Sequence, residues 1–495
     1  MIRRGRSEGW LTLPTSALPA WSTLNNIEYD GVKVKHLPGF EDRGSALVAQ
    51  RSLVGGEEQP LITVPRDMVL SLELVNEHAK SDEDLRNVLA CLGEFGRVGR
   101  FEYLSREEQI IVMLDHFRSN SLVKPSNKSK KLYIKFLPEE LLPTFWTDSE
   151  RKLLIGTTLQ PALEAKLKSL FREFDLIRSS TDQISWCKDI WWDEIDGLLD
   201  LDDWKQCDAM YRSRALEFPG IGDAMVPGID MANHASGDDT AALYETDGGG
   251  NAVLILLDRK RINVGDEVTI TYGDAKGACE MLFSYGFIED SMTSAREMFL
   301  DLEIPDDDPL KRAKNIVSTF APGFRLYDND VSTSWESDYI WLICVNEEDG
   351  LEFKVVQSIH GEQELRVSWK DEELADISGL RSRLESESMW DVFHLRALSI
   401  IKARVEYQLS LLSETDDAAH LSACGEETYI RAKSRDAALK LRTLERILLE
   451  KALGDFEKQS GRLLQSEVIQ RYLQLGTVEE MENTRLDHSS EEDFA

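Results

Sequence analysis

The chain has 495 residues, of which 42% are hydrophobic and 30% are charged. This length and apolar content predict two or three domains with substantial cores and exclude a wholly disordered chain. The formal net charge of −33 at pH 7 argues against nonspecific nucleic-acid binding and is compatible with a basic protein partner, although solubility and acidic loops explain the same charge without a partner.

Membrane, secretion and disulfide signals are absent from the sequence. No apolar run approaches the length that crosses a bilayer, and the basic start MIRRGRSEGW lacks the apolar stretch of a secretory signal. The six cysteines are scattered with no C-x-x-C pair, which argues against a disulfide framework and against a zinc site. We therefore expect a soluble intracellular protein, in the cytoplasm, the nucleus or both, with no membrane and no zinc.

The first predicted elements are short strands between residues 28 and 78. Val32 and Val34 alternate with lysines, and an apolar run follows at Ala46–Ala49. Further short apolar pieces surround the Gly55-Gly56 turn and continue to Leu72.

From residue 79 to residue 204 the pattern changes to helical periodicity. The segment EEQIIVMLDHFRS places Ile110, Ile111, Leu114 and Phe117 on one helix face. The run Thr147–Glu150 has the residues of a helix start. We interpret this block as a helical insertion between two strand-rich halves of one domain.

The stretch from residue 226 to residue 288 has the most informative pattern. The apolar lead-in VPGI ends in DMANH, where polar side chains are presented at the tip of a buried segment. Two strands joined by a turn at Asn263–Asp266 are predicted next, the second with Val268, Ile270 and Tyr272 on one face. Before them, the glycine run 248–250 is predicted to form a hairpin turn and not a phosphate cradle.

Two tyrosines converge in this prediction. Tyr272 ends the second strand, and Tyr285 follows a short helix later. A buried tyrosine needs a hydrogen-bond partner for its hydroxyl. Two tyrosines directed to one place therefore predict a polar pocket with aromatic walls.

A separate lobe is predicted after residue 290. Residues 339–345, 351–357 and 365–369 are predicted strands, with a hairpin turn at Glu348–Gly350. From Met389 onward the pattern is helical, and the polar stretch from Leu412 to Gly425 predicts a loop between antiparallel helices. The residues from about 477 onward are predicted to be disordered.

The motifs DMANH, GDEVTITYG and FSYGF occur in an order and spacing that resemble the SET-domain methyltransferases. The resemblance is to the branch of the Rubisco large-subunit and ribosomal-protein lysine methyltransferases, and it covers most of residues 28–290. It implies an α+β fold: a SET-domain β-fold of short strands with a helical insertion, followed by a mostly α-helical C-terminal lobe. The implied boundaries are an N-terminal segment 1–27, a first SET half 28–78, a helical insertion 79–204, a second SET half 205–290, a substrate-binding-like lobe 291–476 and an acidic tail 477–495.

The resemblance also implies roles for the two tyrosines. Tyr272 corresponds to the catalytic tyrosine of the family, whose hydroxyl orients the transferred methyl group and the incoming nitrogen. Tyr285 is expected to line the substrate lysine channel. Phe287 is expected on the cofactor side, with core packing as the alternative.

Further residues match the family's S-adenosylmethionine site. Asn233 and His234 resemble its Asn-His pair, and Asp230 precedes them in the same motif. Arg214 matches the Ser-Arg motif, where a guanidinium pairs with the cofactor carboxylate. Leu216 is expected to border the target side chain, and an apolar wall suits the methylene groups of lysine better than an imidazole.

The N-terminal cofactor loop departs from the family pattern. The family usually has Gly-x-Gly-Leu, whereas this chain has Gly44, Ser45 and Ala46 before a leucine. Arg43 also stands where an acidic residue is common. Because alanine adds only a methyl group, we expect reduced cofactor affinity and not abolished binding.

The sequence thus predicts a protein-lysine N-methyltransferase that uses S-adenosylmethionine, acts on a non-histone protein such as a ribosomal protein, and needs no metal. One alternative is a protein-histidine methyltransferase of the same branch. Another is a catalytically inactive SET module that binds a protein partner, which the departures at Ala46 and Arg43 allow.

Overall fold

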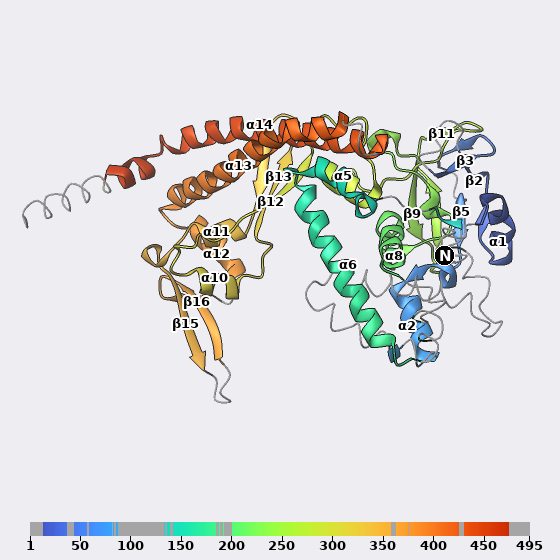
Figure 1. Cartoon of the computed structure of the whole chain (residues 1–495), viewed down its shortest axis with the longest axis horizontal. Coiled ribbons are helices and arrows are strands. Elements are labelled where there is room, and N and C mark those ends of the chain that lie inside the picture. The colour runs from blue at the N-terminus through green and yellow to red at the C-terminus, as the bar shows by residue number, and fades with distance from the viewer. Residues whose placement is uncertain are drawn as a thin grey trace, which may run out of the picture. The chain divides into compact units, whose positions relative to one another are not determined.

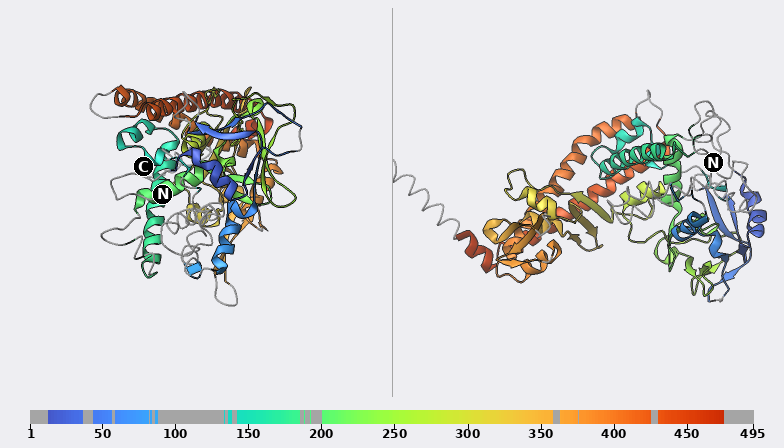
Figure 2. Two further views of the ribbon diagram at one scale, coloured as in Figure 1. Left: turned by 90° about the vertical axis from the view of Figure 1, so that its right-hand side faces the viewer. Right: turned by 90° about the horizontal axis from the view of Figure 1, so that it is seen from below.

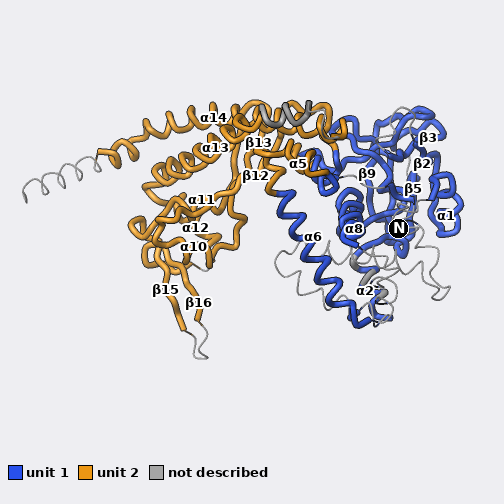
Figure 3. Tube along the Cα trace, in the orientation of Figure 1, with its two compact units in different colours: residues 1–146, 162–275, 282–286 blue, residues 147–161, 276–281, 287–495 orange. Residues whose placement is uncertain are grey.

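The computed structural model describes residues 13–36, 44–56, 59–81, 83, 86–87, 133, 136–138, 142–184, 188, 192, 200–357, 363–374, 376–424 and 430–474. The chain forms two compact units: unit 1 contains residues 1–146, 162–275 and 282–286, and unit 2 contains residues 147–161, 276–281 and 287–495 (Figure 3). The predicted helix at Ile110–Phe117, the residue Arg43 and the predicted acidic tail lie outside the described residues.

Unit 1 is built from short antiparallel strands (Figure 1). Its described strands form sheets in the orders β1-β5-β10-β9, β2-β3, β11-β4 and β6-β8-β7. The elements are α1 (Leu18–Leu24), β1 (Glu28–Tyr29), β2 (Val32–His36), β3 (Ser45–Ala49), β4 (Leu53–Val54), β5 (Ile62–Val64), β6 (Leu70–Ser71), α2 (Leu72–Ser81), α8 (Leu201–Arg214), β7 (Leu216–Phe218), β8 (Gly222–Met225), the 3-10 turn η9 (Ile229–Met231), β9 (Ala242–Thr246), β10 (Ala252–Leu256) and β11 (Arg261–Ile262). Two helices have residues in both units, α6 (Leu159–Thr181) and α9 (Ala278–Tyr285).

The predicted strands before residue 78 are present, and they bury the expected side chains. β3 is buried along its whole length, and Leu47 is fully inaccessible to solvent. The predicted turn at the glycine run joins β9 to β10, which pair antiparallel with Ala252 opposite Thr246. Gly250 completes this turn with a φ of +80°, a conformation that glycine adopts without strain.

The predicted strand through Val268 and Ile270 is not a regular strand. Both side chains are fully buried, so the predicted alternation is correct. The backbone, however, makes only isolated bridges, from Glu267 to Val48 and from Ile270 to His234. The backbone of this segment forms hydrogen bonds with several different segments in succession. It therefore does not form a continuous strand pair with any one of them.

Unit 2 combines two three-stranded antiparallel sheets with two long helices (Figure 1). The sheets have the orders β12-β13-β14 and β15-β16-β17. The elements are α5 (Asp148–Arg151), η8 (Lys152–Leu154), β12 (Glu297–Asp301), α10 (Lys311–Val317), β13 (Gly323–Asp328), β14 (Thr333–Glu336), α11 (Tyr339–Ile343), η11 (Glu347–Asp349), β15 (Leu351–Gln357), β16 (Gln363–Trp369), β17 (Glu372–Glu373), α12 (Leu380–Glu385), α13 (Trp390–Cys424) and α14 (Ala432–Leu463).

One predicted strand of this lobe is wrong. Residues 339–345 contain the helix α11 and are buried on every side. A short apolar run that is buried all round has neither a helical nor a strand period, so its pattern cannot separate the two. Because no strand precedes it, Glu348–Gly350 does not form a hairpin turn. It belongs to the 3-10 turn that leads into β15.

The predicted interhelical loop at Leu412–Gly425 is also wrong for most of its length. α13 continues to Cys424 and lies beside α14 (Figure 2). Asp416 accepts hydrogen bonds from Arg442 and Arg446 of α14. Asp416, a polar residue of the stretch predicted as a loop, thus faces the neighbouring helix.

The predicted helix start at Thr147 is confirmed. Its hydroxyl accepts from the backbone N–H of Glu150, and the Glu150 carboxylate accepts from the N–H of Thr147, which forms a reciprocal capping box. The helix that follows is short, and α6 begins only at Leu159.

Glu445 on α14 is a fully buried carboxyl group. Its oxygens accept from the backbone N–H of Thr158 at 3.2 and 3.1 Å and from the Thr158 hydroxyl. Burial raises the pKa of Glu445 to about 7, although the Thr158 hydrogen bonds and the charge of Arg442 act in the opposite direction.

We expect Glu445→Gln to reduce the pH dependence of unfolding of unit 2. The pKa of the folded state lies above the ordinary 4.5, so the group stabilises the fold fully below that value and loses this contribution as pH rises through about 7. A pKa difference of 2.5 (7 − 4.5) corresponds to about 3 kcal/mol. Urea unfolding at several pH values between about 5 and 8 measures this pH dependence of the free energy of unfolding. The exposed Glu457→Gln is the control, and an unchanged slope in Glu445→Gln would contradict the expectation.

No helix in the described residues is long and apolar enough to cross a membrane. Cys207, Cys279 and Cys344 are free thiols, and burial raises the pKa of each to about 12.

Candidate functional site

The DMANH segment meets the Tyr272 segment through backbone hydrogen bonds. The N–H of Ile270 donates to the carbonyl of Asn233 at 3.0 Å, and the N–H of Ala235 donates to the carbonyl of Ile270 at 2.9 Å. A parallel bridge between His234 and Ile270 results. Two motifs that lie more than 30 residues apart are thereby fixed side by side in unit 1.

Tyr272 is held at three points by this corner. Its backbone N–H donates to Nδ1 of His234 at 3.0 Å, and its ring stacks on the imidazole with a centroid distance of 5.1 Å. Its hydroxyl donates to the carbonyl of Ala232 at 2.9 Å. Because Nδ1 of His234 is an acceptor, the ring proton of this histidine is assigned to Nε2.

The ring of Tyr285 stacks on the ring of Tyr272. The two phenol rings have a centroid distance of 4.7 Å and an interplanar angle of 28°. Tyr285 ends α9, and Gly286 follows with a φ of +77° and an N–H that donates to Leu282. The two tyrosines lie in contact, as their positions in the sequence predict.

The N-terminal loop at Gly44–Ala46, which the sequence assigns to cofactor binding, leads into a strand that contacts the Asn-His pair through Glu267. The amide of Asn233 donates to Oε1 of Glu267 at 2.6 Å. Glu267 bridges to Val48, and the next residue along the chain, Val268, donates its N–H to Leu47 at 2.8 Å. β3 therefore runs beside the Asn-His pair, and its first residues are those that the sequence assigns to cofactor binding.

Within this loop Gly44 has a φ of +73°, and an added Cβ would approach only Pro138, at 3.8 Å. Only glycine adopts that backbone conformation without strain, so the loop retains a requirement for its first glycine. Ser45 is buried, and Ala46 is 1% exposed. The methyl group that distinguishes Ala46 from the usual glycine is thus accommodated inside the fold.

Arg214 is positioned by the backbone of Asp230. Its Nη1 donates to the Asp230 carbonyl at 2.9 Å. The Asp230 carboxylate, which is buried, accepts from the hydroxyl of Tyr133. The pKa of Tyr133 is raised well above its usual value, first by burial and then by the Asp230 charge, against the opposing charge of Arg214. Asp230 therefore fixes the position of Arg214.

Arg212 also has a structural partner close to the tyrosines. Its side chain is 13% exposed and pairs with the fully buried Asp208 at 2.8 Å. Its other terminal nitrogen donates to the Phe283 carbonyl at 2.5 Å, and its guanidinium lies 4.3 Å from the centre of the Phe283 ring. Arg212 is therefore not an ordinary surface residue, because it holds the backbone two residues before Tyr285.

We expect Arg212→Ala to lower turnover roughly tenfold, because a small displacement of Tyr285 misaligns the reacting groups. Arg212→Lys, which keeps the charge but lacks the planar fork, should recover only part of the loss. Steady-state kinetics would show the effect mainly in kcat. The control is Arg261→Ala, at an exposed position of β11 in the same unit. Unchanged kcat in a folded Arg212→Ala protein would contradict this role.

Two further residues, Leu216 and Phe287, have roles assigned from the sequence. Leu216 begins β7, is 6% exposed and pairs with Ala224 of β8. Phe287 belongs to unit 2 and is half-buried. The roles assigned to both residues stay predictions.

The sequence did not single out several residues of this corner. Ala232 contributes only a carbonyl, and no side-chain pattern marks a carbonyl. Glu267 is hidden in the alternation of the predicted strand. Asp208 and Arg212 have the i, i+4 spacing of a helical ion pair, which was a usable signal. Among the residues that the structure describes, no group of three histidine, cysteine or carboxylate side chains is arranged to hold a metal.

No protein-family model matches the chain. The chain is 27% identical to SET domain-containing protein 8 of Schizosaccharomyces pombe over 464 residues, which are 93% of this chain and 99% of that protein. It superposes on the solved structure of Rubisco LSMT bound to AdoMet with a TM-score of 0.62 and 17% identity, covering 93% of this chain and 96% of that one. The chain has the SET-domain fold.

A second structure agrees with this fold. The SET domain of LSMT bound to MeLysine and AdoHcy gives a TM-score of 0.59 at 19% identity, over 94% of this chain and 97% of that chain. Similarity at this level of identity establishes the fold. The α+β prediction of a SET fold is confirmed over nearly the whole length of the chain.

Proposed function

We propose that this protein is a protein-lysine N-methyltransferase that uses S-adenosylmethionine. The observation on which the proposal rests is the arrangement of Tyr272, whose ring stacks on both His234 and Tyr285 while its hydroxyl bonds to the Ala232 carbonyl. A phenol fixed in this way has one direction in which to orient a reacting amine.

The residues around this corner fit the cofactor. A guanidinium at Arg214 suits the carboxylate of the amino-acid portion. The positive φ of Gly44 and the open space at its missing Cβ allow close approach of a ligand to the backbone. Asn233 and His234 are fixed by the bonds to Glu267 and Tyr272. When bound, S-adenosylmethionine supplies a methyl group on a cationic sulfur.

The chemistry asks little of the protein beyond positioning. A lysine amine has a pKa of about 10.4 in water and must lose its proton before it can attack. Desolvation beside the cationic sulfur of the cofactor disfavours the charged form of that amine. The Tyr272 hydroxyl and the Ala232 carbonyl orient the neutral nitrogen, so alignment replaces a strong general base.

Three observations support a lysine on a basic protein as the substrate, and we propose that this protein is not a histone. A net charge of −33 favours a basic protein segment. The apolar Leu216 suits methylene groups better than an imidazole. Solved structures of the same fold are bound to Lysine and to Monomethyllysine. An intracellular site of action, cytoplasmic or nuclear, is part of the proposal.

Labelling of a cell lysate tests the proposal. The purified chain is incubated with lysate and methyl-labelled S-adenosylmethionine, and labelled residues are identified by mass spectrometry. Labelled lysine on a non-histone protein is the expected result, and the rate of labelling should fall about 100-fold with Tyr272→Phe.

Two other outcomes would overturn the proposal in different ways. Labelled histidine would assign the chain to the histidine-modifying alternative. No label, together with no heat on titration with S-adenosylmethionine, would favour a SET module that only binds a partner.

A further inference from the structure

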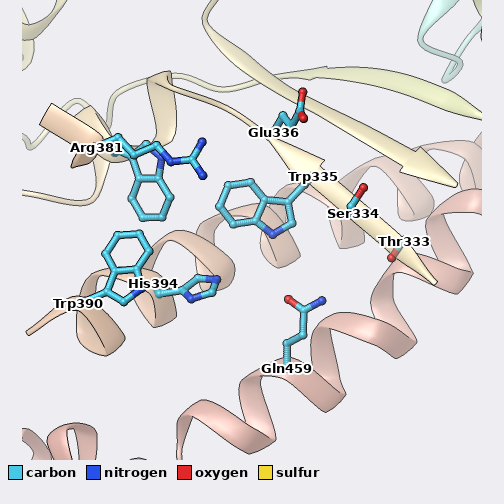
Figure 4. Close-up of a pocket in the computed structure, with 9 residues that line it drawn as sticks. Thr333, Ser334, Trp335, Glu336, Arg381, Trp390, His394 and Gln459 are labelled. Atoms are coloured by element: carbon cyan, nitrogen blue, oxygen red, sulfur yellow. The ribbon is translucent and has the colours of Figure 1, made fainter. Parts of the chain in front are cut away.

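Unit 2 contains a pocket of about 380 Å³ that the proposed reaction does not use (Figure 4). Its walls come from β14, α11, α12, α13 and α14, and four of the nine lining residues are aromatic. The lining residues are Thr333, Ser334, Trp335, Glu336, Trp341, Arg381, Trp390, His394 and Gln459.

Three indoles and an imidazole form a continuous aromatic lining. Trp341 lies 5.8 Å from Trp335 and 4.9 Å from Trp390, measured between ring centroids. His394 lies 5.6 Å from Trp390 and 6.2 Å from Trp335. Figure 4 shows Trp335 and Trp390 on opposite sides of an opening, with His394 below and the amide of Gln459 directed toward it.

The walls are held in place by contacts outside the opening. The backbone N–H and the hydroxyl of Thr333 both donate to Asp455 of α14, at 2.9 and 3.2 Å, which attaches β14 to that helix. Trp341 is only 2% exposed and therefore forms a fixed floor. A pocket whose walls are fixed beforehand binds a ligand with little loss of conformational entropy.

The charges around the opening favour a cation. Arg381 already lies 5.9 Å from the centre of the Trp341 ring, but its charge is paired with Glu385 at 3.0 Å. Glu336 contributes a carboxylate to the lining, and the charge of Asp391 acts on His394. Burial lowers the pKa of His394, so this ring is neutral near pH 7.

We infer that this tryptophan pocket binds the methylated ammonium group of a lysine side chain. The faces of indole rings attract cations, and tryptophan does so most strongly. An unmethylated ammonium group would lose hydrogen bonds to water that ring carbons cannot replace. Methyl groups remove those donors and make desolvation cheaper, so the pocket selects the methylated form.

The choice of a methylated lysine rests on the proposed function, because that group is the product of the proposed reaction. Binding of product-like side chains at a second place would keep a protein that has several target lysines attached between reactions. An anionic ligand is the competing chemistry, and it would depend on Arg381.

Calorimetry of the full-length chain with N-acetyl-trimethyllysine amide tests the inference, with the unmethylated lysine derivative as the second ligand. We expect the trimethylated compound to bind the wild type and Tyr272→Phe alike. Trp335→Ala should weaken binding about tenfold, since one cation–π contact contributes roughly 1–2 kcal/mol. Trp335→Phe should recover part of it, and Arg381→Ala should bind as tightly as the wild type or more tightly.

The control is Tyr407→Ala, which removes an aromatic side chain that is 62% exposed and does not line the pocket. Equal binding by wild type and Trp335→Ala, no preference for the methylated ligand, or a loss in Arg381→Ala would each overturn the inference. Loss of lysate labelling with retained binding would instead contradict the proposed function alone, because the two measurements depend on different residues.

Discussion

Replacement of Tyr272 by phenylalanine should lower turnover roughly 100-fold, the usual effect of removing one hydrogen-bonding group directed at the reacting atoms. The ring contacts with His234 and Tyr285 do not involve the hydroxyl and should persist. The backbone bond from residue 272 to His234 also remains. The loss is therefore confined to the hydroxyl and its bond to Ala232.

Cofactor binding by the Tyr272→Phe protein should be nearly unchanged, because the proposed contacts lie at Gly44, Asn233 and Arg214. Calorimetry with S-adenosylmethionine and kinetics on the labelled substrate separate the two effects. Tyr244→Phe is a suitable control: this tyrosine lies on β9 of the same unit and packs on Phe218, with ring centroids 4.8 Å apart. Wild-type kcat in Tyr272→Phe, or loss of cofactor binding, would refute the assigned role.

The sequence predicts the fold and the contact between Tyr272 and Tyr285 because both depend on local patterns. Strand alternation, turn residues and the Tyr-Gly pairs are readable within windows of about ten residues. Resemblance to the SET family supplied the arrangement of those pieces. The contact of Tyr272 with Tyr285 then follows, although the two residues are 13 positions apart.

The errors arise where a distant partner decides the local structure. The sequence around Asp416 is typical of a loop. In the structure, however, Arg442 and Arg446 of α14 form ion pairs with Asp416 of α13. Residues 267–270 look like one strand, but their backbone bonds go to Leu47, Asn233 and the start of β9. No sequence window contains both partners, so local propensity gives the wrong answer.

The positioning residues were missed for the same reason. The contact between Arg212 and Phe283 joins positions 71 residues apart. The contact between Tyr133 and Asp230 joins positions 97 residues apart. A motif marks the residues that touch a ligand, whereas the residues that hold them are specified by packing alone.

The largest expected effect on stability is at Arg431, which lies just before α14. Its partner is Glu150, 281 positions earlier in the chain. Glu150 is completely buried, and Arg431 donates to it from Nε at 2.7 Å, from Nη2 at 2.6 Å and from its backbone N–H at 3.0 Å. Burial alone would raise the pKa of Glu150. The bonds from Arg431 and Thr147 outweigh it, and the pKa falls to about 2.

Arg431→Ala should therefore destabilise unit 2 by about 3–5 kcal/mol at neutral pH, because it leaves a carboxylate buried without its counter-charge. The sign of the pH dependence follows from the lowered pKa. The pair stabilises the fold above the ordinary pKa of 4.5, and that contribution is lost as pH falls toward about 2. The deficit of the variant should accordingly be largest above about pH 5 and shrink in acid.

Urea unfolding of the full chain from about pH 3 to pH 7 measures this deficit. Arg435→Ala, which removes an arginine that is 40% exposed on the same helix, should cost less than about 1 kcal/mol. Adding Glu150→Gln to Arg431→Ala should restore part of the stability, because a neutral amide is cheaper to bury than an unpaired carboxylate. A deficit that is independent of pH, or no recovery in the double variant, would mean that Arg431 acts through packing and not through its charge.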